Sequence, residues 1–277
     1  MKLAFARVTE TERLYGSSYV TWFAAPELLR GATPGQFVML RCGEPAPHGE
    51  AQPRAIDLPD DPLLPRAMSI HRVRPGPDGP EWSILYDVVG RGTSWLARRE
   101  PGDEVYAWGP LGRGYSLRSA GQQLLLVGGG IGIAPLIWLA EEAVAKGKSV
   151  VLIHGARNAD GVFPAELVPP EAEVVVTTED GSLGRKGRVT DVFLDYYGWA
   201  DGVYACGPNP MFAALAELLV KHEGSGRNRR RKPVQALLES PMGCGTGICY
   251  GCAVFDRRGE SRLVCKDGPR FELRDVF

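Results

Sequence analysis

The cysteines near the C-terminus constrain the fold of this chain more than any other feature. The last four follow a C-x4-C-x2-C-x12-C pattern, made up of Cys244, Cys249, Cys252 and Cys265. This is the plant-type spacing for a [2Fe–2S] cluster. Glycines stand at positions 243, 245, 247 and 251, and a loop around a cluster needs both the backbone freedom of glycine and N–H groups close to sulfur. The pattern therefore predicts an iron–sulfur loop, and with it a role in electron transfer.

Two other uses of these thiols stay open at this point. Structural zinc also accepts four thiolates, although its ligands usually form two short pairs in sequence. Disulfides suit an exported chain, but the N-terminal stretch is too short and too soon charged for a signal peptide. The remaining cysteines, Cys42 and Cys206, stand apart from the pattern.

The size and charge of the chain limit the kinds of protein that it can be. Its 277 residues suffice for two compact domains and a small module. A net charge of −1 indicates neither a nucleic-acid nor a membrane surface, and no apolar run approaches the roughly 20 residues of a spanning helix. The basic run at 227–233 lies between a Gly-Ser segment and an apolar stretch, which favours a solvated linker over a partner-binding patch. Because the cysteines are expected to be reduced, we expect a cytoplasmic protein.

Residues 1–115 contain short β segments separated by turn residues. Strands are predicted at 35–41, 81–89 and 102–112, and such strands suit a small closed antiparallel barrel. The proline-rich stretch at 43–65 is predicted to be a surface loop.

The pattern changes at residue 122. Apolar runs predict buried strands at 122–127, 149–154, 173–178 and 202–205, with helices at 136–146 and 211–220. Strands that alternate with helices form a doubly wound parallel sheet. The sequence thus predicts a β-barrel domain at 1–115, an α/β domain at 116–226 and a small C-terminal [2Fe–2S] module at 227–277.

Three segments follow strands at one edge of the predicted sheet, where open α/β sheets bind ligands. Residues 128–135 form a glycine-rich turn whose N–H groups favour a pyrophosphate. The turn does not match G-x-G-x-x-G in register, because Ile133 takes the place of the last glycine. The other two segments are 178–184 and 205–211. The alternative for residues 128–135 is a tight turn that binds no ligand. The alternative for Cys206 is a small buried residue with no contact to a ligand.

The barrel half offers a weaker phosphate site. A guanidinium at Arg66 suits bidentate phosphate binding, and the Ser69 hydroxyl can hydrogen-bond the edge of a ring. Residues 85–87 add an aromatic face, and residues 90–94 add a glycine turn with hydroxyls. A surface ion-pair role for Arg66 is the alternative.

Together these segments resemble the ferredoxin-reductase superfamily of flavoproteins. The resemblance rests on residues 66–69, 92–93, 128–135 and 206–208. The cysteine module, preceded by Glu239-Ser-Pro-Met242, narrows it further. Over its whole length the chain resembles the electron-transfer subunits of class B dihydroorotate dehydrogenases.

The resemblance implies a set of cofactor sites. FAD would lie between the two large domains, contacted by Arg66, Ala67, Met68, Ser69, Leu85, Tyr86, Asp87, Gly92 and Thr93. NAD would enter the α/β half near Gly130, Gly132, Cys206, Gly207 and Pro208. The four C-terminal cysteines would hold the cluster near the surface that meets a catalytic partner. The chain departs from the family pattern in having Ala67 where a proline is common and Asp87 where a basic residue is expected.

The implied function is a redox relay in pyrimidine biosynthesis. A separate FMN-bearing subunit would oxidise dihydroorotate, and this chain, within a heterotetramer, would pass the electrons through the cluster and FAD to NAD⁺. A flavin is needed because the cluster moves one electron and nicotinamide accepts two. No side chain of this chain is expected to act as a general acid or base.

Other classes remain open from the sequence. An NAD(P)H–ferredoxin oxidoreductase or a sulfide-dehydrogenase-like subunit shares the 178–182 type of segment, and Arg157 could then contact a 2′-phosphate. The reductase component of an oxygenase usually carries a larger ferredoxin module. A non-enzymatic module whose cysteines bind zinc belongs to a different class altogether.

Overall fold

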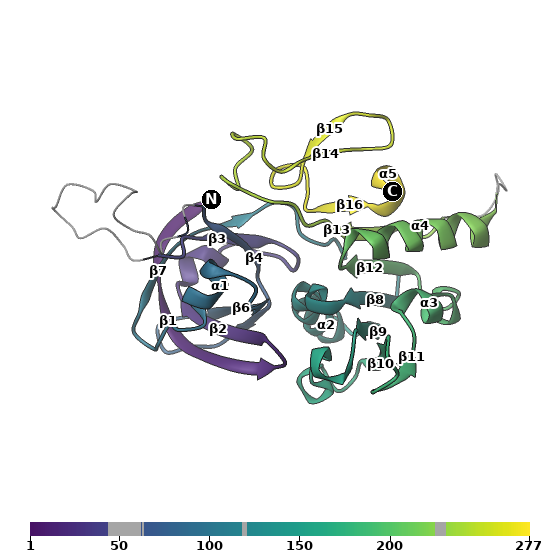
Figure 1. The fold of residues 1–277 in the computed structure, drawn as a ribbon, viewed down its shortest axis with the longest axis horizontal. Helices are drawn as coiled ribbons and strands as arrows, with labels where there is room; N and C mark the ends of the chain where they lie inside the picture. The colour runs from purple at the N-terminus through teal and green to yellow at the C-terminus, as the bar shows by residue number, and fades with distance from the viewer. Residues whose placement is uncertain (44–61, 63, 118–120, 225–230) are drawn as a thin grey trace.

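The computed structural model describes residues 1–43, 62, 64–117, 121–224 and 231–277. Two seven-stranded sheets and one two-stranded sheet form its framework. Figure 1 shows the first sheet beside the second, with the C-terminal segment (yellow) lying across the top of both. The predicted proline-rich loop at 43–65 and basic linker at 227–233 lie largely outside the described residues.

The first sheet is antiparallel and curls on itself. Its strand order is β4-β3-β7-β1-β2-β6-β5, so the two edge strands are consecutive in the chain. Its elements are β1 (Lys2–Tyr15), β2 (Ser18–Ala24), β3 (Phe37–Leu40), β4 (Arg66–Ser69), β5 (Arg72–Arg74), β6 (Glu81–Asp87) and β7 (Glu104–Leu111), with a 3-10 turn at Pro26–Leu29 and helix α1 (Arg91–Leu96). Inside, Phe23 stacks on the fully buried Trp82 with ring centroids 4.5 Å apart. The predicted antiparallel barrel domain is confirmed as a curled sheet whose strand order leaves β4 and β5 as its edges.

The second sheet is parallel apart from its last strand. Its order is β11-β10-β9-β8-β12-β13-β16, formed by Arg185–Lys186, Glu173–Thr178, Ser149–Ala156, Gln123–Gly129, Gly202–Cys206, Val234–Leu237 and Arg270–Glu272. The chain leaves β8 in one direction through β9 and β10 and returns to the other side of β8 with β12. The strand order therefore reverses between β8 and β12, which is where doubly wound sheets bind ligands.

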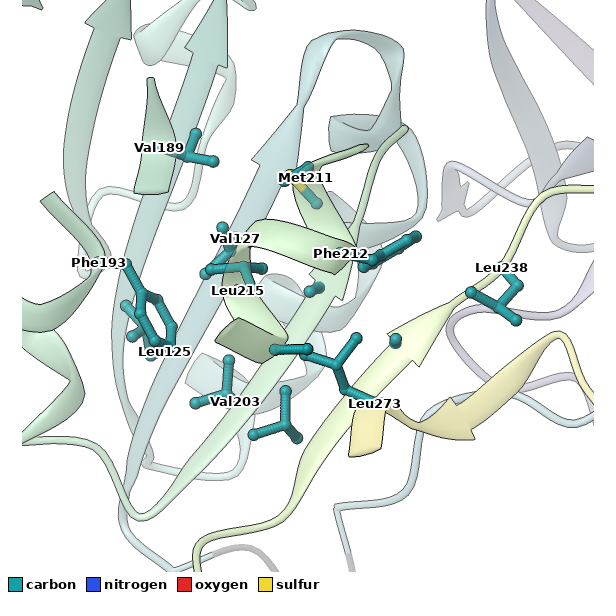
Figure 2. Close-up of a cluster of buried hydrophobic side chains, with 14 of the residues drawn as sticks. Leu125, Val127, Val189, Phe193, Val203, Met211, Phe212, Leu215, Leu238 and Leu273 are labelled. Atoms are coloured by element: carbon teal, nitrogen blue, oxygen red, sulfur yellow. The ribbon is translucent and has the colours of Figure 1, made fainter. Parts of the chain in front are cut away.

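Helices cover both faces of this sheet, as predicted. Helix α2 (Ala134–Ala145) packs on one face with Leu124 and Leu126 of β8. Helices α3 (Val189–Tyr197) and α4 (Asn209–Glu223) pack on the other, over Leu125 and Val127, and Figure 2 shows these side chains with Phe212 and Leu215. Both α2 and α4 begin earlier than expected because a proline stands in the first turn of each, where its missing N–H costs nothing. In the described part of the chain, no helix has the length and apolarity needed to cross a membrane.

The C-terminal segment is divided between the second sheet and a separate hairpin. β13 pairs in parallel with β12, β16 pairs antiparallel with β13, and α5 (Leu273–Val276) packs beside them. β14 (Ala253–Phe255) and β15 (Ser261–Leu263) form the hairpin. Part of residues 227–277, where the sequence places a cluster module, thus belongs to the sheet of the α/β half. The reason lies in the apolar run that begins at Val234, which suits a strand buried on both faces.

One hydrogen bond joins the barrel to the start of α2. His71 lies between β4 and β5, and its Nδ1 is 2.7 Å from the carbonyl oxygen of Ala134. The ring is buried, and it meets Phe163 edge to face. Burial lowers the pKa of His71 to about 4, so the ring is neutral at pH 7 and Nδ1 donates the bond.

Candidate functional site

A cavity of ≈ 600 Å³, here called the junction cavity, lies where the barrel, the parallel sheet and the C-terminal segment meet. β4, β6 and α1 bring one group of predicted site residues to its wall: Ala67, Met68, Ser69, Leu85, Tyr86, Asp87 and Thr93. The end of β12 brings another: Cys206, Gly207 and Pro208. Residues predicted for FAD and residues predicted for NAD, more than a hundred positions apart in the sequence, therefore line one space.

A second cavity of ≈ 750 Å³, here called the strand-edge cavity, runs along the carboxyl ends of the parallel strands. Gly130 follows β8, Arg157 follows β9 and Glu179 follows β10, and all three line it. The turn between β1 and β2 closes its other side. The two cavities adjoin, because they share Asp87, Val89, Ile131 and Pro208.

Two glycines of the turn after β8 serve different purposes. Gly130 has a φ of +54° and lines the strand-edge cavity, and a Cβ built on it would meet no atom within 4 Å. Its backbone is therefore open to a ligand. A Cβ on Gly132 would lie 2.3 Å from the carbonyl oxygen of Cys206. Gly132 lines neither cavity and is needed for the close approach of this turn to the end of β12.

Arg66 and Gly92, also predicted site residues, lie together outside the linings of both cavities. A Cβ on Gly92 would lie 2.8 Å from Nε of Arg66, so the guanidinium passes directly over the first turn of α1. Nη1 of Arg66 donates to the carbonyl oxygen of Leu64 at 2.6 Å. Thr93 organises the same turn, since its Oγ1 accepts the N–H groups of Val89 and Gly90 at 3.0 and 3.2 Å. The result is a cationic cradle beside the junction cavity.

The polar groups of the junction cavity are held by neighbouring strands. The Tyr86 hydroxyl lies 3.0 Å from Oγ1 of Thr21, and burial raises the pKa of Tyr86 to about 12. Ser18 donates to Oδ1 of Asp87 at 2.5 Å. Burial also raises the pKa of the Cys206 thiol well above its usual range, and this thiol is 1% exposed. Tyr86 and Cys206 are therefore neutral at pH 7.

The four C-terminal cysteines lie in the loops around the β14–β15 hairpin. Sγ of Cys244 accepts the N–H groups of Thr246 and Cys249 at 3.4 and 3.5 Å. Although burial of this thiol acts in the opposite direction, these two bonds lower the pKa of Cys244 to about 6. The sulfur atoms of Cys252 and Cys265 are 3.2 Å apart. In the described residues, no three His, Cys, Asp or Glu side chains stand close enough together to hold a single metal ion.

The cysteine loop nevertheless has the backbone that a cluster needs. The N–H of Gly251 donates to Cys249 and that of Cys265 to Cys252, each at 3.5 Å. With the bonds to Cys244, N–H groups therefore reach three of the four predicted sulfur ligands, which is how a protein stabilises the negative charge of cluster thiolates. Gly245 has a φ of +71°, and a Cβ there would lie 2.6 Å from Met39, so this position admits only glycine without a shift.

The segment just before the cysteines also lines the junction cavity, which the sequence did not predict. It contributes Glu239, Ser240, Pro241 and Met242. Burial of the Glu239 carboxyl group raises its pKa, because the charged form loses contact with water. The turn between β1 and β2 in the strand-edge cavity was missed as well. The first segment stands out in the sequence only by its place before the cysteines, and the second carries no motif.

Two family models match parts of the chain. The iron–sulfur cluster binding domain of dihydroorotate dehydrogenase B matches residues 239–277. The oxidoreductase NAD-binding domain matches residues 126–217. The first contains all four predicted cluster ligands, and the second contains the turn after β8 and the end of β12.

Curated relatives and solved structures match most of the chain. The electron transfer subunit of dihydroorotate dehydrogenase B (NAD(+)) from Desulforamulus reducens is 36% identical over 276 residues, which is 98% of this chain and 96% of the relative. The subunit of the same name from Bacillus mycoides is 40% identical over 88% of this chain and 86% of its own length.

Among solved structures, the NADH-dependent reduced ferredoxin-NADP oxidoreductase, described for flavin-based electron bifurcation, is 26% identical. It has a TM-score of 0.78 and covers 99% of this chain and 90% of its own. A ferredoxin NADP⁺ reductase from Neisseria gonorrhoeae, solved with FAD and NADP, shares the fold at 18% identity with a TM-score of 0.60, covering 86% of this chain and 98% of its own. The cysteine module, the adjoining cavities and the identity to curated relatives along nearly the whole chain show that the protein belongs to the family of dihydroorotate dehydrogenase B (NAD(+)) electron transfer subunits.

Proposed function

We propose that this chain relays electrons from a dihydroorotate-oxidising subunit to NAD⁺. The observation that carries the proposal is the continuity between the two kinds of site. Residues 239–242 line the junction cavity, and Cys244, the first predicted cluster ligand, follows two residues later. A cluster on this loop would therefore lie next to a flavin in the cavity.

The residues around the junction cavity fit FAD. The cavity is flanked by the backbone of β4 and the aromatic ring of Tyr86, and the cationic cradle of Arg66 and the α1 turn lies beside it for a pyrophosphate. When bound, FAD would exchange electrons singly with the cluster and in pairs with NAD⁺. The wall residues would exclude water and hold the ring against Ser69 and Tyr86.

The strand-edge cavity fits NAD. Gly130 leaves room at the turn after β8 for a pyrophosphate to approach the backbone. Pro208 and Ile131 line both cavities, so a nicotinamide placed beside them would meet the flavin at the shared wall.

The exposed part of the cysteine loop suits a catalytic partner. Cys249 is exposed, and beside it Ile248 and Tyr250 are 80% and 65% exposed. Large apolar side chains around a redox centre form the kind of surface that a protein partner covers. We propose that an FMN-bearing dihydroorotate dehydrogenase subunit binds here, that two copies of each subunit form a heterotetramer, and that the complex is cytoplasmic.

Co-expression with the candidate catalytic subunit tests this proposal. The purified complex should form NADH when given dihydroorotate and NAD⁺. The double substitution Ile248→Asp and Tyr250→Ala should lower that rate at least about tenfold through loss of the partner, while reduction of a dye by NADH stays unchanged.

Val220→Asp provides the matched control, because Val220 is 63% exposed on α4. It should alter neither rate. Full coupled activity in the double variant would place the partner on another face, and absence of dihydroorotate-dependent NADH formation in the unaltered complex would end the proposal.

A ferredoxin-linked oxidoreductase is the second candidate. The likeness to the NADH-dependent reduced ferredoxin-NADP oxidoreductase over 99% of this chain supports it. In that case the purified complex would reduce ferredoxin from a nicotinamide cofactor and would leave dihydroorotate unchanged.

A further inference from the structure

Glu179 lies at the end of the strand-edge cavity that is remote from the junction cavity. β8, β9 and β10 are neighbours in the sheet, and their carboxyl ends present Gly130, Arg157 and Glu179 to one space. With strands about 4.8 Å apart, the end of β10 lies roughly 10 Å from that of β8. A dinucleotide with its nicotinamide at Pro208 and its pyrophosphate at Gly130 would extend its adenosine toward Glu179.

The backbone around Glu179 is fixed by the preceding strand. The N–H of Glu179 donates to the carbonyl of Ala156 at 3.1 Å, and that of Asp180 donates to the carbonyl of Arg157 at 3.2 Å. Ser182 completes the connection, since its Oγ accepts the N–H of Ala159 at 2.7 Å. The loops after β9 and β10 therefore hold each other, and the backbone at Glu179 is fixed at the edge of the cavity before a ligand binds.

The charges at this end of the cavity favour a ribose diol over a phosphate. Arg188 also lines this cavity, and Oε2 of Glu179 lies 3.8 Å from its Nη2, so the carboxylate offsets that positive charge. The Glu179 side chain is 51% exposed and lines the cavity, so its oxygen atoms can accept hydrogen bonds from two ribose hydroxyls. A 2′-phosphate carries about two negative charges, so this carboxylate would repel it.

Arg157 stands one strand nearer to Gly130 than Glu179 does. It lines the cavity after β9, between the positions expected for the pyrophosphate and the adenosine ribose. Its guanidinium is therefore placed to contact the phosphates that NAD and NADP have in common.

The geometry assigns Glu179 as the residue that selects NAD(H) over NADP(H) in this chain. The assignment rests on the proposed function, because it requires a nicotinamide dinucleotide in the strand-edge cavity. It adds a named selector to that function and gives Arg157 a role that does not discriminate between the two cofactors.

Calorimetric titration of the full FAD-loaded chain with NAD⁺ and with NADP⁺ tests the assignment, since neither oxidised dinucleotide reacts. The unaltered protein should bind NAD⁺ more tightly. Glu179→Gln should lower the ratio of the NADP⁺ Kd to the NAD⁺ Kd about tenfold, because it removes the like charge and keeps the shape. Glu217→Gln, at an exposed ion-paired position on α4, should leave the ratio unchanged within about twofold.

Arg157→Ala should weaken both dinucleotides by a similar factor. An unchanged ratio in Glu179→Gln with NAD⁺ still bound, or a selective loss of NADP⁺ binding in Arg157→Ala, would overturn the assignment and leave the proposed function standing. If the unaltered chain bound neither dinucleotide, the strand-edge cavity would not be the NAD site of the proposed function, and the assignment of Glu179 would fail with it.

Discussion

The hydrogen bond between His71 and Ala134 predicts a specific dependence of stability on pH. The folded pKa of His71 is about 4, against an ordinary value of 6.5, with burial as the main cause and the charge of Arg72 acting in the same direction. Between these two values the unfolded chain binds the proton more readily than the folded chain does. Stability is therefore lost as the pH falls from 6.5 toward 4, and the contribution of this residue is constant below that window.

The magnitude follows from the two pKa values. Going from pH 7 to pH 5, His71 should cost the folded state about 2 kcal/mol, because the unfolded imidazole is almost fully protonated at pH 5 and the folded one is not. His154 is also buried, with a pKa lowered to about 4 by desolvation, so comparison with a variant is needed to isolate His71.

His71→Asn is the suitable variant, because the Asn amide can donate from a position close to that of Nδ1 and does not titrate. Urea unfolding of both proteins at pH 7 and pH 5 gives four free energies of unfolding. The unaltered protein should lose about 2 kcal/mol more than His71→Asn between the two pH values. Equal losses in the two proteins would refute the assignment of a neutral, buried His71 at the junction of the two large halves.

Three further substitutions test other parts of the structure. Gly132→Ala places a Cβ 2.3 Å from the Cys206 carbonyl oxygen and should lower Tm by at least about 5 °C. Gly198→Ala is the control, because its Cβ would meet nothing within 4 Å, and it should change Tm little. Similar Tm values for the two variants would show that the turn at Gly132 can move away from Cys206. Cys249→Ser should abolish the visible absorbance of the cluster and retain bound FAD, and a fully retained cluster spectrum would remove Cys249 from the ligand set. Glu223→Gln weakens the charged hydrogen bond with Arg274, in which the side chains are 12% and 15% exposed, and should cost about 2 kcal/mol in urea unfolding. Glu217→Gln, which removes the charge of the exposed pair with Lys221, should cost less than about 1 kcal/mol. Equal costs for the two substitutions would show that burial does not strengthen the Glu223–Arg274 pair.

The parallel strands of the α/β half were predictable because each carries a short apolar run. β8, β9 and β12 have apolar and largely buried centres, and β10 has a run of three valines that is partly buried. The long strand β1 gave no comparable signal. Its pattern of burial is irregular and many of its residues are charged or exposed, so its pairing with β2 and β7 decides its structure more than its own sequence does.

The candidate site was predictable where a motif carries local chemistry. Spacing alone predicts the four cysteines as cluster ligands, and the glycine turn after a buried strand predicts a nucleotide site at residues 128–135. The role of Gly132 depends on contact with Cys206, 74 positions farther along the sequence, and no local pattern reveals such an approach. The return of β13 and β16 to the parallel sheet is also a long-range pairing, and it is this pairing that carries residues 239–242 to the wall of the junction cavity.

Reductive titration of the anaerobically purified chain measures the central claim most directly. A chain that holds one FAD and one [2Fe–2S] cluster should take up about three electrons, two on the flavin and one on the cluster. The paramagnetic signal of a reduced [2Fe–2S] cluster should appear during the titration. Uptake of about two electrons with no such signal, together with zinc instead of iron in elemental analysis, would contradict the account.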